Sequence, residues 1–201
     1  TGLQALHPLF PNVDWGDLEL APPFVTFNDR MDLYSGDLKI ELIFMGPAHT
    51  TNDIIAWVPD RKLLFAGDLL FNQGTPFMAM GSVSGSLQAL KRLRNLGAET
   101  IVPGHGSVCG PEVMGDVGAY LTFIQKTARQ AFEAGFSPLE ASRQADLGRF
   151  GEWHDSERIA GNLHRAYSEL RWEPAGTVLG LAPMVADMVS LNGGQPVRCL
   201  A

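Results

Sequence analysis

Three segments in the first half of the chain each carry an apolar run into a turn that presents a possible metal ligand. They are residues 46–50 (GPAHT), 64–68 (LFAGD) and 101–106 (IVPGHG). Any one of them more often marks an ordinary turn, but loops at the edge of a rigid sheet are where ligands converge. Together, in this order, the segments predict that His49, Asp68 and His105 meet at one sheet edge. Zinc accepts two imidazoles and a carboxylate, and a carboxylate can bridge two ions.

Composition narrows the class of protein further. The 201 residues correspond to about one domain with an appendage. A net charge of −7 argues against nucleic-acid binding, and a hydrophobic content of 45% supports a packed core. No apolar run is long enough to span a membrane, and two cysteines cannot form a disulfide framework, so we expect a cytoplasmic protein. The chain starts at Thr1 without a Met, which favours an internal start in a longer protein.

Hydrophobic periodicity predicts an α/β layer over residues 1–110 and a helical region over residues 111–201 that packs on it. The prolines of the opening stretch indicate loop or edge structure. Strands are expected over 24–27, 31–34, 38–44, 54–58, 63–65 and 100–102. Helices are expected over 86–96, 120–134, 155–170 and 178–191, with a further helix that starts at Ser137, where Pro138 and Glu140 complete a capping box.

The three motifs resemble those of the metallo-β-lactamase superfamily over roughly residues 23–110. This resemblance implies an αββα sandwich with a two-zinc site at its edge. It also implies that His49 binds one ion, that His105 binds the other, and that Asp68 binds both and is the catalytic residue. The expected fold is therefore the C-terminal part of such an α/β sandwich, followed by a C-terminal helical appendage.

The chain departs from the superfamily at the signature His-x-His-x-Asp-His, which it does not contain. His7 is the only histidine before His49, and its surroundings do not match. Three ligands shared by two ions should hold zinc poorly, so we expect a depleted site in this chain. Truncation would also expose apolar surface, and we expect either a retained N-terminal fragment or a homo-oligomer that covers residues 38–44 and 54–58.

Segments outside the metal motifs resemble one branch of the superfamily, the second-ring cyclases of aromatic polyketide biosynthesis. The matching segments are 13–20 (VDWGDLEL), 75–77 (TPF), 81–83 (GSV), 110–113 (GPEV), 162–166 (NLHRA) and 192–201. The resemblance implies a zinc-dependent aldol-type ring closure and dehydration, a step of antibiotic biosynthesis, with thioesterase activity as a second reaction. Two alternatives stay open: a generic zinc hydrolase of a thioester or lactone, and an inactive truncated fragment.

A ring-containing polyketide needs an apolar slot, and the loop after Asp68 supplies candidates for substrate binding: Phe71, Phe77, Met78 and Met80. Ordinary core packing explains these four residues equally well. Asp53 is a candidate general base, although its position favours a role in capping the turn before residue 54.

The expected partner is the polyketide intermediate on an acyl carrier protein, which is acidic and would require a local basic face. One candidate face is Lys91, Arg92 and Arg94, and the other is Arg158, Arg165 and Arg171. A solvated helix surface is the alternative meaning of both.

Overall fold

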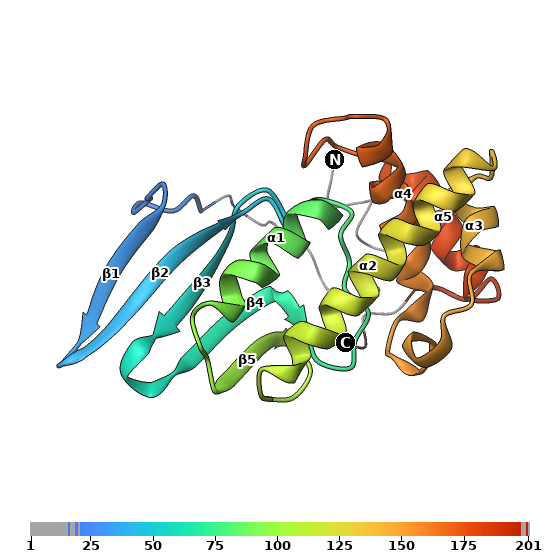
Figure 1. Cartoon of the computed structure of the whole chain (residues 1–201). Coiled ribbons are helices and arrows are strands. Elements are labelled where there is room, and N and C mark those ends of the chain that lie inside the picture. The colour runs from blue at the N-terminus through green and yellow to red at the C-terminus, as the bar shows by residue number, and fades with distance from the viewer. Residues whose placement is uncertain (1–15, 17–18, 20, 198–199, 201) are drawn as a thin grey trace.

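The computed structural model describes residues 16, 19, 21–197 and 200, and His7 and most of segment 13–20 lie outside them. A five-stranded sheet runs in the order β1-β2-β3-β4-β5, and helices pack on one of its sides (Figure 1). The strands are β1 (Arg30–Ser35), β2 (Leu38–Gly46), β3 (Asp53–Val58), β4 (Leu63–Phe71) and β5 (Thr100–His105). β1 to β4 are antiparallel neighbours, whereas β5 runs parallel to β4 after a crossover through a helix.

The helices follow mainly in the second half of the chain, so the predicted α/β class is confirmed. They are α1 (Val83–Arg94), α2 (Glu112–Glu133), α3 (Pro138–Gln144), α4 (Ile159–Leu170) and α5 (Leu181–Leu191). Short 3-10 helices occupy Pro59–Arg61, Gly148–Glu152 and Ser156–Arg158. In the part of the chain that the structure describes, no helix combines the length and apolar content needed to cross a bilayer.

Five of the six predicted strands are present, and β2, β4 and β5 extend past their expected ends at residues 44, 65 and 102. Residues 24–27 form no strand: Phe24 is 99% exposed, and the preceding Pro22 and Pro23 disfavour a paired ladder. β4 continues to Phe71 instead of turning at residues 66–68, because the irregularity at Gly67 (φ +52°) is accommodated within the strand.

The helix starts differ more from the predictions. α1 begins at Val83 and not after Ser86, because Ser82 is the N-cap and accepts a hydrogen bond from the Gly85 amide at 2.9 Å. Serines at 82, 84 and 86 all suit a cap, so local sequence could not choose among them. The capping box at Ser137 is confirmed, with the Glu140 carboxylate accepting from the Ser137 amide at 2.8 Å.

Three other helices have shifted starts. α2 begins eight residues before the expected Tyr120, at Glu112, because its glycines are compatible with a packed helix: Gly118 lies against the Arg94 and Leu90 side chains. α4 begins at Ile159, since Asp155 adopts a left-handed conformation (φ +57°). α5 begins at Leu181 and not at residue 178.

One continuous core joins the sheet to the helices. It includes Leu64 of β4 and Ile101 of β5, both fully buried, together with Leu90 of α1, Leu121 of α2 and Leu163 of α4. The apolar contacts therefore run without interruption across position 110, where the sequence predicted the change from the α/β layer to the helical region. The same core fixes the strand ends that carry the candidate site.

Candidate metal centre

The three candidate ligands come together at one end of the sheet. His49 follows β2, Asp68 lies at the irregularity in β4, and His105 is the last residue of β5. His49 Nε2 lies 3.4 Å from Asp68 Oδ2, and His105 Nε2 lies 3.6 Å from Asp68 Oδ1. The Asp68 carboxylate is thus flanked by one imidazole on each oxygen, and both histidines present the same ring nitrogen to it.

These separations fit the donor geometry of zinc. Two ligands of one tetrahedral zinc, each bonded at about 2.1 Å, are about 3.4 Å apart. Among the described residues, no group of three or more His, Cys, Asp or Glu side chains is arranged so that it could hold a metal ion by itself. The three residues therefore supply donors suited to zinc, and by number they form a partial set.

Burial gives His49 the protonation state that metal binding requires. Desolvation lowers its pKa, and the Asp68 charge opposes that change only in part. The neutral imidazole is the form that binds metal ions. Its Nδ1 is buried and has no hydrogen-bond partner among the described residues, so Nε2 is the nitrogen directed at the carboxylate.

Phe71 packs beneath both imidazoles and limits how they can turn. Its ring stacks on His105 with centroids 4.6 Å apart and lies 6.0 Å from the His49 ring centroid. Gly104 is required beside this group, because a Cβ there would lie 2.0 Å from Asp68 Oδ1. The glycine that precedes the histidine in the third motif therefore has a steric reason, which the sequence alone did not show.

Asp53 holds the loop that carries His49. Its Oδ2 accepts hydrogen bonds from the Thr50 amide at 2.8 Å and the Ala48 amide at 3.1 Å, and its Oδ1 accepts from Thr50 Oγ1 at 2.8 Å. Both carboxylate oxygens of Asp53 therefore accept hydrogen bonds from the residues on either side of His49. The expectation that Asp53 caps the turn is confirmed, and these bonds argue against its use as a general base.

The start of α1 holds the same loop from the other side. The Ser82 amide donates to the Ala48 carbonyl at 2.8 Å. A Cβ at Gly81 would lie 2.0 Å from that carbonyl oxygen, and one at Gly85 would lie 1.9 Å from the Pro47 oxygen. Only glycine at these two positions lets the helix backbone contact the loop backbone so closely.

The four candidate substrate-binding residues lie in different surroundings. Phe71 and Met78 are 2% exposed, and Met78 Sδ accepts a hydrogen bond from Ser86 Oγ. Phe77 is half-buried and packs near Gly161 of α4, whereas Met80 is 60% exposed. The structure thus places two of the four in the core and leaves Met80 the most accessible; a substrate-binding role remains a prediction.

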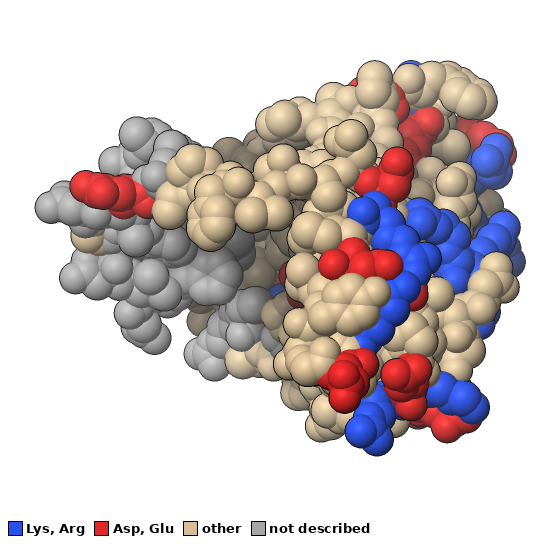
Figure 2. All heavy atoms as spheres, turned by 90° about the vertical axis from the view of Figure 1, so that its left-hand side faces the viewer, with Lys and Arg blue, Asp and Glu red and all other residues tan. Residues whose placement is uncertain are grey.

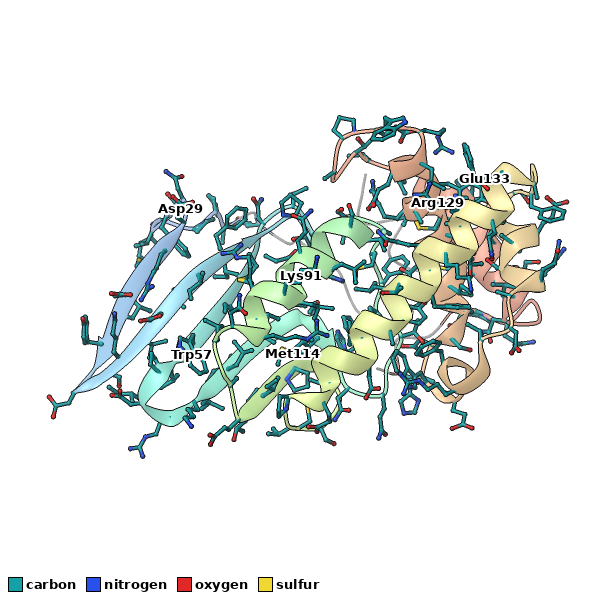
Figure 3. The ribbon with its side chains drawn as sticks, in the orientation of Figure 1. Asp29, Trp57, Lys91, Met114, Arg129 and Glu133 are labelled. Carbon is teal, nitrogen blue, oxygen red and sulfur yellow. The ribbon has the colours of Figure 1, made fainter. Side chains whose placement is uncertain are left out.

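The two candidate basic faces also differ. Figure 2, seen from the β1 edge, shows Lys and Arg side chains on one half of the molecule, with Asp and Glu side chains interspersed among them. The last turn of α1 carries Lys91, Arg92 and Arg94, with Lys91 on the outward side of the helix (Figure 3). The face built from Arg158, Arg165 and Arg171 was a wrong prediction, because Arg158 is 6% exposed and Arg165 is fully buried.

Those two arginines and Asn162 have structural roles that periodicity did not reveal. Arg165 donates to the carbonyls of Ala79 and Thr177, and Arg158 donates to the Thr75 carbonyl at 2.9 Å. Asn162 accepts from the Met78 amide at 2.8 Å and donates to the Pro76 carbonyl at 2.8 Å. Polar residues within the apolar pattern of 159–170 were the available signal that α4 holds the 75–79 loop.

A protein-family model for the metallo-beta-lactamase superfamily matches residues 5–105, which include all three candidate ligands. The chain belongs to the metallo-β-lactamase superfamily. The beta-lactamase-like protein 2 homolog of Caenorhabditis elegans is 29% identical over 84 residues, which are 42% of this chain and 28% of the relative. A hydroxyacylglutathione hydrolase of Bartonella tribocorum is 38% identical over 66 residues, 33% of this chain and 24% of the relative. In both, the match spans under a third of the relative's length.

One solved structure shares the fold of most of this chain. The sec-alkylsulfatase Pisa1 from Pseudomonas sp. aligns with a TM-score of 0.57 at 13% identity and covers 74% of this chain. The aligned part is 26% of the sulfatase chain. The likeness shows a shared fold, an arrangement of sheet and helices common to both proteins, over 74% of this chain.

Proposed function

We propose that this superfamily member contributes part of a zinc centre to an enzyme that closes a ring in an aromatic polyketide intermediate by an aldol-type addition and dehydration. The observation that carries the zinc assignment is the Asp68 carboxylate with one imidazole on each oxygen. The cyclase assignment is supported by the resemblance of segments across the whole chain, including residues 162–166 in α4.

In the proposed site, His49 and His105 would each hold one ion and Asp68 would be shared between two. When bound, zinc acts as a Lewis acid that polarises a carbonyl oxygen. The chain's own residues do the rest: burial lowers the pKa of His49 and so favours its neutral form, Phe71 stacks on the His105 ring, and Asp53 fixes the His49 loop. Catalytic zinc has about three protein ligands per ion, so the remaining ligands would come from outside these residues.

A simpler hydrolase is the second candidate. It is favoured by the similarity to a relative named hydroxyacylglutathione hydrolase and needs the same three donors. In that case the substrate would be a thioester or a lactone. An acidic acyl carrier protein would fit either candidate, with the last turn of α1 as the proposed docking face.

The first prediction concerns metal content. We expect the chain alone to retain less than one tightly bound zinc per molecule after dialysis, because its three ligands are a partial set. Asp68→Asn should weaken zinc binding at least about tenfold, since it removes the carboxylate charge from both imidazoles. Titration calorimetry and elemental analysis measure both quantities. Two tightly held equivalents would contradict the partial site.

Product analysis separates the two proposed reactions. A bicyclic polyketide intermediate and a simple acyl thioester are each incubated with the zinc-loaded protein and with its Asp68→Asn variant. Ring closure and aromatisation are detected by mass spectrometry as loss of water without release of acid, and hydrolysis is detected as release of acid and thiol. Acid release alone from both substrates would replace the cyclase proposal with the hydrolase, and no turnover with a fully loaded site would exclude both.

A further inference from the structure

The start of α1 is held by a carboxylate from the C-terminal helical region. Glu169 of α4 lies 86 residues from Val83 in sequence, and its Oε1 accepts from the Val83 amide at 2.5 Å and from Ser82 Oγ at 3.0 Å. Its Oε2 accepts from the Ser84 amide at 3.2 Å. An α-helix leaves its first amides without intrahelical partners, and a negative charge at this end is favourable. Glu169 therefore completes a cap that Ser82 only begins.

The capped turn is the part of α1 that touches the His49 loop. The Ser82 amide bonds to the Ala48 carbonyl, and Gly81 and Gly85 let the helix backbone lie against residues 47–49. The opposite side of the loop is bound by Asp53 through the amides of Ala48 and Thr50. The loop backbone is thus fixed from two sides, and one side depends on Glu169.

We infer that Glu169 is a positioning residue for His49, so that the helical region sets the geometry of the candidate zinc ligand through the first turn of α1. This inference rests on the proposed role of His49 in zinc binding. Loss of the Glu169 carboxylate leaves the Val83 and Ser84 amides without their acceptor, and the first turn of α1 then loosens. The Ala48 carbonyl loses a fixed partner, and the His49 backbone gains freedom.

Glu133 supplies a matched control. It lies on α2 (Figure 3) and lines the same surface groove as Glu169, and its carboxylate makes no hydrogen bond or ion pair with another described residue. Glu169→Ala and Glu133→Ala therefore remove equal charge from one groove, but only the first removes acceptors from α1. Glu169→Gln keeps an oxygen for part of the cap and serves as the conservative variant, and it also serves if the alanine variant does not fold.

Two measurements on the full chain test the inference. In Glu169→Ala, amide hydrogen exchange at Ala48 and Thr50, which Glu169 does not touch, should be about tenfold faster, with β4 amides unchanged. The zinc dissociation constant should rise about tenfold, the range expected when an outer support of a ligand is lost. Glu169→Gln should give smaller changes and Glu133→Ala none.

The positioning role of Glu169 and the proposed zinc function can fail independently of each other. Unchanged exchange at Ala48 and Thr50 in the Glu169 variants would overturn the positioning role. If the wild-type chain binds no zinc at all, the proposed metal function fails, and the exchange measurement alone still decides whether Glu169 positions the loop.

Discussion

The two faces of the β1–β2 hairpin carry different kinds of side chain, charged on one face and apolar on the other. On the side that faces the helices, four charged residues form ion pairs: Arg30, Asp32, Lys39 and Glu41. On the opposite side, where no described helix packs, the same strands carry apolar residues: Met31, Leu33, Ile40 and Leu42. The hairpin is therefore charged on the face toward the helices and apolar on the face that no described helix covers. We call this second face of the sheet, with Met31, Leu33, Ile40 and Leu42, the open face.

The same contrast continues in β4. Leu64 faces the helices and is fully buried, whereas Phe65, the next residue, faces the other way and is 44% exposed. Ile54 of β3 is 45% exposed on that open side. Strands that are apolar on both sides are typical of sheets covered on both faces. The αββα resemblance implies a second sheet there, and the match spans under a third of the two relatives described above.

The largest expected effect is a difference in stability between variants on the two faces of the sheet. Leu64→Ala should lower the free energy of unfolding by about 2–5 kcal/mol, because it opens a cavity in a packed core. Phe65→Ala should lower it by under about 1 kcal/mol, since nearly half of that side chain already contacts solvent. Urea denaturation of both variants measures the difference. Equal losses would show that the open face is covered in solution.

The next effect concerns association through the open face. Ile54→Lys and Phe65→Lys should weaken self-association, or binding of an added N-terminal fragment, by about tenfold or more because each places a charge in an apolar contact. Sedimentation velocity over a range of concentrations measures it. Lys91→Glu, on the helix side, is the control and should leave association unchanged. A wild-type chain that stays monomeric and binds no fragment would remove this expectation.

The smallest effect concerns the charged side. A hydrogen bond from Lys39 holds the pKa of Asp32 below its ordinary value of 3.8. Its contribution to stability is therefore present above pH 3.8 and is lost as the pH falls through the lower folded-state pKa. Asp32→Asn should be slightly less stable than the wild type at pH 7, and the two should converge toward pH 2. Added salt should reduce the difference at pH 7, because exposed ion pairs are screened.

Sequence reasoning succeeded where a local signal had one meaning. Alternation in residues 38–42 indicated β2, and Ser137, Pro138 and Glu140 indicated the start of α3, because both patterns depend on neighbours in the chain. It failed for the start of α1, which depends on Glu169, a residue 86 positions from Val83. It also failed for Arg158 and Arg165, whose charges indicated a surface but whose partners are distant backbone carbonyls.

The sequence by itself determined the superfamily's three ligand motifs, their order and the strands that carry them, because each depends on residues close together in the chain. Only the tertiary structure decided that the Asp68 carboxylate lies between the two imidazoles. It also decided that the helical region reaches the same loop through Glu169. The physical reason is that these contacts join segments whose separation in space is set by packing of the shared core, which no local pattern encodes.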